Sequence, residues 1–156
     1  AIVFVGSCRR AQETAEMLSL LGLECDALHS ALSQPRRLAA LGKFKSQRSR
    51  VLVCTDVASR GLDIPTVDLV ANLDLPRVAA DYVHRVGRTA RAGRRGRAVS
   101  LVAPEDVALV HAVEALTGTP LEECGDVAPD DAAALLKTVA RALRTARARL
   151  AAAGFD

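Results

Sequence analysis

The sequence predicts an α/β fold in which a mostly parallel sheet is covered by helices on both faces. Short apolar, β-branched runs alternate with longer segments whose apolar residues recur at helical spacing. The runs are continuously apolar, which is typical of parallel strands buried between two helical layers. With 156 residues, 50% of them hydrophobic and 25% charged, the chain has the length and composition of one globular domain.

The alternation predicts five strands and, before residue 118, four helices. The strands are expected near Ile2–Val5, Cys25–Leu28, Val51–Cys54, Val67–Leu73 and Ala98–Val102. The helices are expected near Arg10–Leu21, Pro35–Lys45, Ala79–Arg88 and Glu105–Thr117. Parallel strands are joined by right-handed crossovers, and such sheets bind ligands at the carboxyl ends of their strands. A functional site is therefore expected in the loops that follow the strands.

The pattern changes after Pro129, where an alanine-rich segment over residues 132–153 predicts one long helix. Four arginines and four leucines are spread along it. The arginines are expected to form the solvated face of a packing helix, with a second contact to nucleic acid as the alternative. We therefore expect a domain over residues 1–128 and a helical extension over residues 129–156 that packs on it or follows it.

Composition excludes several classes of protein. No apolar run approaches the roughly 20 residues of a membrane helix, and no signal peptide is evident, so no membrane contact is expected. The four cysteines include no CxxC pair, which favours reduced thiols and an intracellular protein over a zinc site or a disulfide framework. The chain opens on the apolar run Ala1–Val5 without a methionine, so we expect it to be a segment of a longer protein.

Positive charge is concentrated in one stretch of the sequence. Residues 77–97 hold seven arginines and one acid, Asp81, so this stretch carries +6 whereas the rest of the chain carries −3. Arginine outnumbers lysine 18 to 3, and its planar guanidinium suits phosphate better than the point charge of lysine. A polyanion is therefore the first partner that the sequence predicts.

A dense group of polar residues follows the third expected strand. Residues 55–65 contain hydroxyls, carboxylates, one arginine and one glycine, where a parallel sheet binds its ligand. Single residues also have structural explanations: Asp56 as a helix cap, Gly61 as a residue with positive φ, and Asp63 as the start of a turn. Both interpretations stay open for each residue.

A second polar group occupies residues 82–93. Helical spacing places His84, Arg88 and Arg91 within about 60° of one another and lets the two valines of this segment turn toward the core. Like charges one turn apart repel by a few tenths of a kcal/mol, so two guanidiniums on one face indicate a bound anion. A solvated basic face is the alternative.

These residues resemble the motifs of the DEAD-box RNA helicases. Thr55–Pro65 resembles motif V of this family, and His84–Arg91 matches the HRxGRxxR core of motif VI. Ile2–Val5 with Ser7 resembles motif IV, and Ser33–Arg37 resembles the QxxR segment. The four motifs occur in the family's order, and motif VI is specific even alone. The remainder of the chain is weakly similar to a nucleolar branch that acts in ribosome assembly, which implies the nucleus or nucleolus.

The resemblance implies a RecA-like three-layer fold and the C-terminal half of an ATP-dependent RNA helicase. These 156 residues contain no GxxxxGK[ST] phosphate loop, no DEAD tetrapeptide and no adenine-reading Q motif, which the family carries on an N-terminal RecA-like domain. The implied partners are that domain and RNA, and the implied cofactors are ATP and Mg²⁺, with the Mg²⁺ ligands on the N-terminal domain. The isolated chain is expected to be a monomer without activity.

The resemblance also implies roles for individual residues. Arg88 and Arg91 would be the catalytic arginine fingers that reach the γ-phosphate when the two halves close. The residues implied to bind ATP are Asp63, Gly61, His84 and Arg85, with Asp63 on the ribose and the last two also tying motif VI to the partner domain. The residues implied to contact the RNA backbone are Ser7, Gln34, Arg37, Thr55, Arg60 and Gly61. Backbone contacts carry no base code, so weak sequence preference is expected.

Three positions depart from the family's pattern. The family usually has glycine where Ala90 stands, alanine where Ser59 stands and glycine where Ser30 stands. Alanine favours a helical backbone over glycine by roughly 1 kcal/mol, so Ala90 is expected to hold Arg88 and Arg91 at least as rigidly as glycine would.

Two other functions compete with this interpretation. A nucleic-acid-binding module could use the same arginines without any motor. A Rossmann-like nucleotide-binding enzyme is disfavoured because no GxGxxG follows the first strand.

Overall fold

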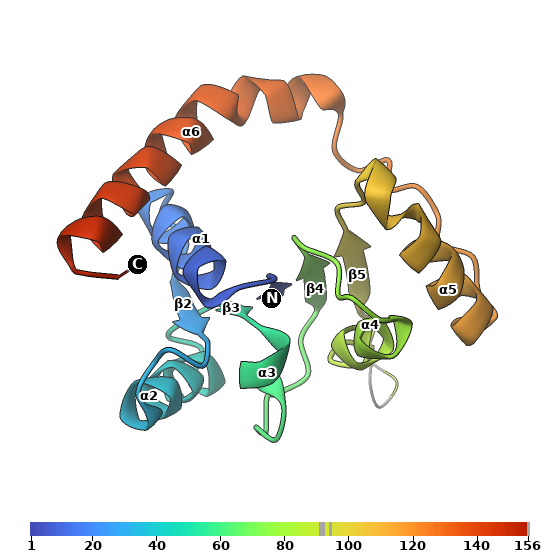
Figure 1. The fold of residues 1–156 in the computed structure, drawn as a ribbon, viewed down its shortest axis with the longest axis horizontal. Coiled ribbons are helices and arrows are strands. Elements are labelled where there is room, and N and C mark those ends of the chain that lie inside the picture. Colours follow the sequence, from blue (N-terminus) through green and yellow to red (C-terminus); the bar gives the residue numbers. More distant parts are fainter. Residues whose placement is uncertain (91–92, 94, 156) are drawn as a thin grey trace.

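The computed structural model describes residues 1–90, 93 and 95–155, and it shows a five-stranded sheet between two helical layers (Figure 1). The strands are β1 (Ile2–Phe4), β2 (Cys25–Leu28), β3 (Val51–Cys54), β4 (Leu69–Asn72) and β5 (Arg97–Ser100). Their order is β2-β3-β1-β4-β5, and every neighbouring pair is parallel. The predicted fold class and all five predicted strands are confirmed. The fourth strand is shorter than expected because Val67 forms only an isolated bridge, to Thr89.

The helices follow the strands as the alternation predicts. They are α1 (Cys8–Leu20), α2 (Gln34–Lys45), α3 (Asp56–Ser59), α4 (Ala79–Val86), α5 (Val107–Thr117) and α6 (Pro129–Ala152), with a 3₁₀ turn, η1 (Pro104–Asp106), before α5. Two differences from the prediction matter for the site. The short helix α3 was not expected, and α4 ends two residues earlier than Arg88.

The core lies on both faces of the sheet because successive side chains of a strand point to opposite sides. Ile2 and Phe4 of β1 pack with residues of α2 and α3, such as Phe44 and Ala58. Residues of the opposite face, among them Val53, pack against α1. Figure 1 shows α1 on one side of the sheet and α2 and α3 on the other. The central strands are thus fixed from both sides, which holds their carboxyl ends in place.

Helix α6 packs on α1 through its C-terminal half. Ala146 is fully buried there. Arg147 donates a hydrogen bond to Glu13 at 3.1 Å, and Arg149 donates one to Glu16 at 2.9 Å. The predicted packing helix is therefore present, but two of its four arginines form ion pairs with α1, whereas the prediction left all four to solvent. None of the helices that the structure describes is long and apolar enough to span a membrane.

The four cysteines are free thiols, as expected from their spacing. Burial raises the pKa of Cys25 and of Cys54 to about 12, so both thiols stay protonated at neutral pH.

Candidate functional site

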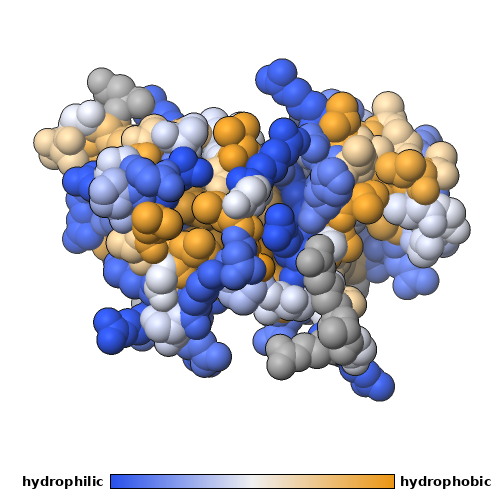
Figure 2. All heavy atoms as spheres, turned by 90° about the horizontal axis from the view of Figure 1, so that it is seen from below, coloured by the Kyte–Doolittle hydropathy of each residue, from blue (hydrophilic) through white to orange (hydrophobic). Residues whose placement is uncertain are grey.

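A pocket of 440 Å³ opens at the carboxyl edge of the sheet, between α3 and α4. Its lining combines both polar groups that the sequence singles out. The lining residues are Phe4, Asp56, Ser59, Arg60, Gly61, Asp81, Val83, His84, Arg85, Gly87 and Arg88. In the view from below, hydrophilic residues cross the middle of the molecule between areas that include apolar residues (Figure 2). The carboxyl edge is where a parallel sheet binds ligands, so this pocket is the candidate site.

Helix α3 brings the first polar group to the pocket. The chain leaves β3 at Thr55 in an extended conformation and turns at once into α3, where the Ser59 hydroxyl donates to the Asp56 carbonyl at 3.0 Å. The fully buried Ala58 anchors the turn on the core. Gly61 follows with φ +72°, a conformation that glycine adopts without strain. The structural explanation for Gly61 is therefore correct, and it leaves a functional role open.

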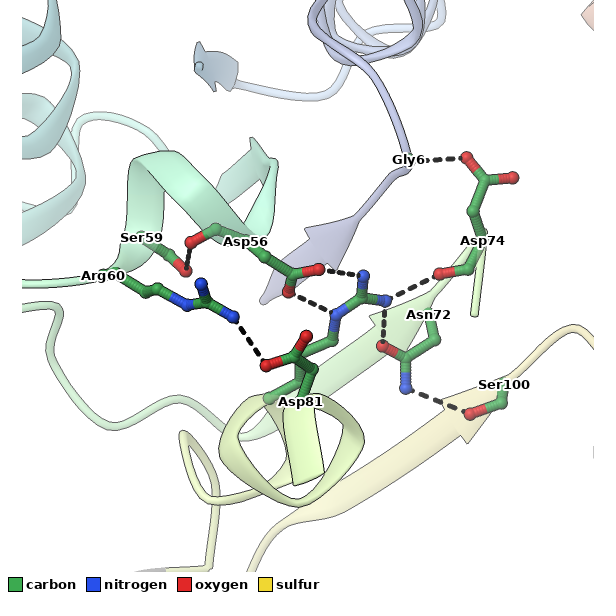
Figure 3. Close-up of polar contacts among 9 residues, drawn as sticks. Gly6, Asp56, Ser59, Arg60, Asn72, Asp74, Asp81 and Ser100 are labelled. Carbon is green, nitrogen blue, oxygen red and sulfur yellow. Dashed lines mark hydrogen bonds and ion pairs between the residues drawn. The ribbon is translucent and has the colours of Figure 1, made fainter. Parts of the chain in front are cut away.

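Arg85 joins the two polar groups from inside the protein through Asp56, Asn72 and Asp74, which are labelled in Figure 3. Its Nε and Nη2 donate to the two carboxylate oxygens of Asp56 at 2.6 and 2.7 Å. Its Nη1 donates to the Asn72 side chain at 3.1 Å and to the Asp74 carbonyl at 2.6 Å. The guanidinium lies 4.9 Å from the ring centroid of Phe4, and the side chain is only 2% exposed. Arg85 thus holds the ends of three strands and α3 together.

A second ion pair joins the same two segments at the surface. Arg60 Nη2 lies 2.6 Å from Asp81 Oδ1, and the Arg60 side chain is 62% exposed. Asp56 and Arg60 lie at the two ends of the α3 segment, and Asp81 and Arg85 lie four residues apart on α4. Each aspartate pairs with the arginine of the other segment. All four residues line the same pocket, and Figure 3 labels Asp56, Arg60 and Asp81 there.

The end of α4 differs from the prediction. Gly87 is the C-cap, and the Arg88 and Thr89 amides bond to carbonyls only three residues back, so the regular helix stops at Val86. The expectation that His84 and Arg88 lie on one continuous helical face is therefore wrong, although both line the pocket. The predicted burial of Val83 is also wrong, because this side chain is exposed. The buried side of α4 carries Arg85 instead. Arg91 lies outside the described residues.

Ala90 adopts a left-handed conformation with φ +54°. The expectation that it continues a helix is therefore wrong, and glycine would fit this backbone without strain. The neighbouring Thr89 hydroxyl donates to the Val67 carbonyl at 2.5 Å. A Cβ on Gly96 would overlap the Thr89 hydroxyl and lie 2.5 Å from the Ala90 nitrogen. Gly96 thus lets the chain return closely past the turn that carries Arg88.

Asp63 does not line the pocket. Its side chain is 92% exposed and pairs with Lys45 of α2 at 2.8 Å. The hydrogen bond from Lys45, assisted by its positive charge, lowers the pKa of the Asp63 carboxyl. The carboxylate is exposed to solvent, but in this conformation it pairs with Lys45 and does not share the pocket lining with Gly61, His84 and Arg85.

The residues implied to contact RNA follow the carboxyl ends of β1, β2 and β3. Ser7 caps α1 by accepting a hydrogen bond from the Arg10 amide at 3.1 Å. Gln34 and Arg37 share the first turn of α2, where the Arg37 Nη1 donates to the Gln34 side chain at 3.3 Å. The Thr55 hydroxyl is buried without a hydrogen-bond partner among the described residues. The structure therefore brings these residues to one edge of the sheet, where Gly61 also lies.

Sequence reasoning missed the residues that support the site from behind. Asn72 ends β4, is 1% exposed and donates to the Ser100 hydroxyl at 3.1 Å. The Asp74 carboxylate accepts from the Gly6 amide at 2.9 Å and pairs with Arg10 at 2.6 Å. The sequence signal that could have identified Asn72 and Asp74 is their position as polar residues at the end of an apolar strand. No group of three or more His, Cys, Asp or Glu side chains among the described residues is placed to hold a metal ion.

Comparisons with known proteins agree with this fold. The family model described as the helicase conserved C-terminal domain matches residues 1–93. The solved structure of the Escherichia coli DEAD-box protein SrmB, bound to regulator of ribonuclease activity A, is 43% identical with a TM-score of 0.71, over 77% of this chain and 71% of that one. This chain belongs to the helicase C-terminal domain family, in its DEAD-box group. The DEAD-box domain has the RecA-like fold that the sequence predicts.

Other relatives place the DEAD-box domain within longer proteins. The DEAD-box ATP-dependent RNA helicase 36 of Arabidopsis thaliana is 49% identical over 100% of this chain, which covers 32% of that protein. The ATP-dependent RNA helicase dbp8 of Schizosaccharomyces pombe is 48% identical over 99% of this chain and 34% of its own length. The structure of the C-terminal domain of the DEAD-box protein Dbp5 is 34% identical, with a TM-score of 0.70, over 90% of this chain and 81% of that domain. The chain spans about a third of the length of the two helicases.

Proposed function

We propose that this domain is the C-terminal half of an ATP-dependent RNA helicase that closes on an N-terminal RecA-like domain of the same protein. Closure would complete an ATPase site and clamp the RNA backbone. The observation that carries the proposal is the pocket at the carboxyl edge of the sheet, where motif V and motif VI residues meet. Two relatives that are 49% and 48% identical to this chain over nearly its whole length are named ATP-dependent RNA helicases.

The catalytic part of the proposal rests on Arg88, with Arg91 in the same role. Arg88 lines the pocket on a turn braced by Gly96 and Thr89, so its backbone is held while its side chain can reach a phosphate. Phosphoryl transfer builds negative charge on the equatorial oxygens of the γ-phosphate, and a guanidinium stabilises that charge. Because the phosphates would arrive on the other domain, Arg88 acts only on closure. Mg²⁺ accompanies ATP in the proposal, with its ligands on the N-terminal domain.

The ATP-binding part of the proposal concerns His84, Gly61, Asp63 and Arg85. His84 is exposed in the pocket and can donate to a phosphate or to the facing domain. Gly61 leaves its backbone open to a ligand, and Asp63 can exchange Lys45 for a ribose hydroxyl. Arg85 has its donors bonded within the domain, so it supports the nucleotide site by holding Asp56 and α4 in place.

The RNA-binding part of the proposal rests on the edge formed by Ser7, Gln34, Arg37, Thr55, Arg60 and Gly61. Helix N-termini and glycine turns present amides to phosphate, and the arginines add positive charge. Backbone contacts of this kind would hold RNA without reading its bases. The proposal includes a nuclear or nucleolar role in ribosome assembly, supported by the resemblance of the C-terminal segment to that branch.

The test is a phosphate-release assay with single-stranded RNA on the full-length protein and on the 156-residue domain. The full-length protein is expected to hydrolyse ATP in an RNA-stimulated manner, and the domain alone to show no turnover. Turnover by the isolated domain that survives Arg88→Ala would contradict the proposal. A domain affinity for RNA that does not change when the other half and ATP are added would favour a binding module without a motor.

A further inference from the structure

Two ion pairs, whose arginines differ in burial, connect the motif V segment to α4. Asp56 with Arg85 forms the inner pair, in which both carboxylate oxygens are used and the arginine is 2% exposed. Arg60 with Asp81 forms the outer pair, through one contact of 2.6 Å, and this arginine is 62% exposed. The inner pair can hold the two segments together when the outer pair opens.

We propose that Asp81 competes with RNA phosphate for Arg60, so that the outer pair closes over this arginine when RNA is absent and opens when RNA binds. This inference rests on the proposed function, because it assigns a regulator to the RNA contact of Arg60. A carboxylate and a phosphate are recognised by the same planar donors of a guanidinium, so both cannot hold the same face of Arg60.

The energetics of an exposed pair suit an exchange of this kind. A solvent-exposed ion pair contributes little to stability, whereas breaking a buried pair is strongly destabilising. A phosphate can therefore replace Asp81 at Arg60 at small cost, while Arg85 keeps Asp56. The Asp81 side chain is 22% exposed, so water can solvate its carboxylate once Arg60 has left.

The position of Asp81 makes the competition specific to one arginine. Asp81 lies in the first turn of α4 and faces Arg60 across the pocket, whereas Arg85 is bonded to Asp56, Asn72 and Asp74. Arg37 lies on α2, where its Nη1 donates to the Gln34 side chain. Removal of the Asp81 charge is therefore expected to act on RNA binding through Arg60.

The test measures RNA affinity of the full-length protein without nucleotide, over a salt series. Asp81→Asn is expected to bind single-stranded RNA about two- to fivefold more tightly, the range set by an exposed ion pair. The magnitude of the log K against log salt slope should rise by up to roughly 0.7, because one more charge becomes available to phosphate. Asp131→Asn makes the same charge change on the exposed first turn of α6 and should leave the affinity unchanged.

Two further variants separate the possible results. Asp81→Glu keeps the charge and is expected to bind RNA like the wild type, which excludes a general effect of altering α4. In Arg60→Ala the added Asp81→Asn change should give no gain, because the arginine it would release is gone. An Asp81→Asn protein with unchanged or weaker RNA affinity overturns this inference. If Arg60→Ala itself leaves the affinity unchanged, the RNA-binding role of Arg60 in the proposed function fails, and this inference fails with it.

Discussion

Arg85 donates to both carboxylate oxygens of Asp56, at 2.6 and 2.7 Å, from a position that is 2% exposed. The pair connects the start of α3, directly after β3, with the middle of α4. Both residues belong to sequence motifs for which the resemblance implies contacts with ligands, yet their strongest contacts are with each other. The geometry of the candidate site therefore depends on a buried charge pair beneath it.

The first prediction concerns the stability that this pair provides. Arg85→Ala should lower the free energy of unfolding by about 3–5 kcal/mol, because it leaves Asp56 without its partner in a partly buried place. Urea unfolding of the 156-residue domain, followed by circular dichroism, measures the change. Arg60→Ala removes the exposed arginine of the outer pair and should cost at most about 1 kcal/mol. Equal losses for the two variants would contradict the difference in burial.

The second prediction concerns Gly96, where a side chain has no room. Gly96→Ala would push a methyl group into the Thr89 hydroxyl and the Ala90 backbone, so the turn must shift. Overpacking of this kind costs typically about 1–3 kcal/mol, and here it also strains the Thr89 bond to Val67. Gly125→Ala is the matched control, because nothing lies within 4 Å of its added Cβ. A thermal midpoint that falls only for Gly96→Ala is the expected result.

The third prediction concerns Ala90, whose φ is +54°. A left-handed alanine costs about 1–2 kcal/mol, and glycine loses about 0.5–1 kcal/mol more through unfolded-state entropy. Ala90→Gly should therefore leave the thermal midpoint unchanged or raise it by about 1–4 °C, and change ATP turnover of the full-length protein only modestly. Ala115→Gly, inside α5, should lower stability by roughly 1 kcal/mol. A large loss of turnover in Ala90→Gly would show that the alanine has a functional role.

The fold was predictable because its signals are local. Each strand is an apolar run, and the helices between them show apolar residues at the helical period, so strand order along the chain and the parallel sheet followed from the pattern. The edge that carries the site followed from the same rule, since Thr55 and the residues after it come directly behind a strand.

The contacts that shape the site were not predictable, because they join residues far apart in sequence. The partner of Arg85 lies 29 residues away at Asp56, and sequence alone offers several acids for that place. The end of α4 also depends on context: Gly87 and the left-handed Ala90 break the helical spacing that the arginines suggest. Motif resemblance assigned Arg85 to the nucleotide side, whereas in this structure its donors are bonded within the domain.

The last prediction separates the two groups of arginines in the full-length protein. Arg37 and Arg60 follow the ends of β2 and β3, where RNA phosphates are proposed to bind. Loss of either should weaken RNA binding for all sequences and reduce the magnitude of the log K against log salt slope by roughly 0.7. Arg88 lines the pocket on the turn after α4, and its loss, like that of Arg91, should leave RNA binding nearly intact while cutting ATP turnover by on the order of 10³-fold or more.

The measurements are RNA affinity over a salt series with a non-hydrolysable ATP analogue, and single-turnover hydrolysis, for each alanine variant. An arginine finger stabilises mainly the transition state, so its removal changes the rate far more than the affinity of the ground state. A phosphate contact changes the affinity and its salt dependence, because each neutralised phosphate releases condensed counterions. If Arg88→Ala flattens the salt slope while hydrolysis persists, the turn after α4 is an RNA-binding surface, and a module without a motor becomes the better account of this domain.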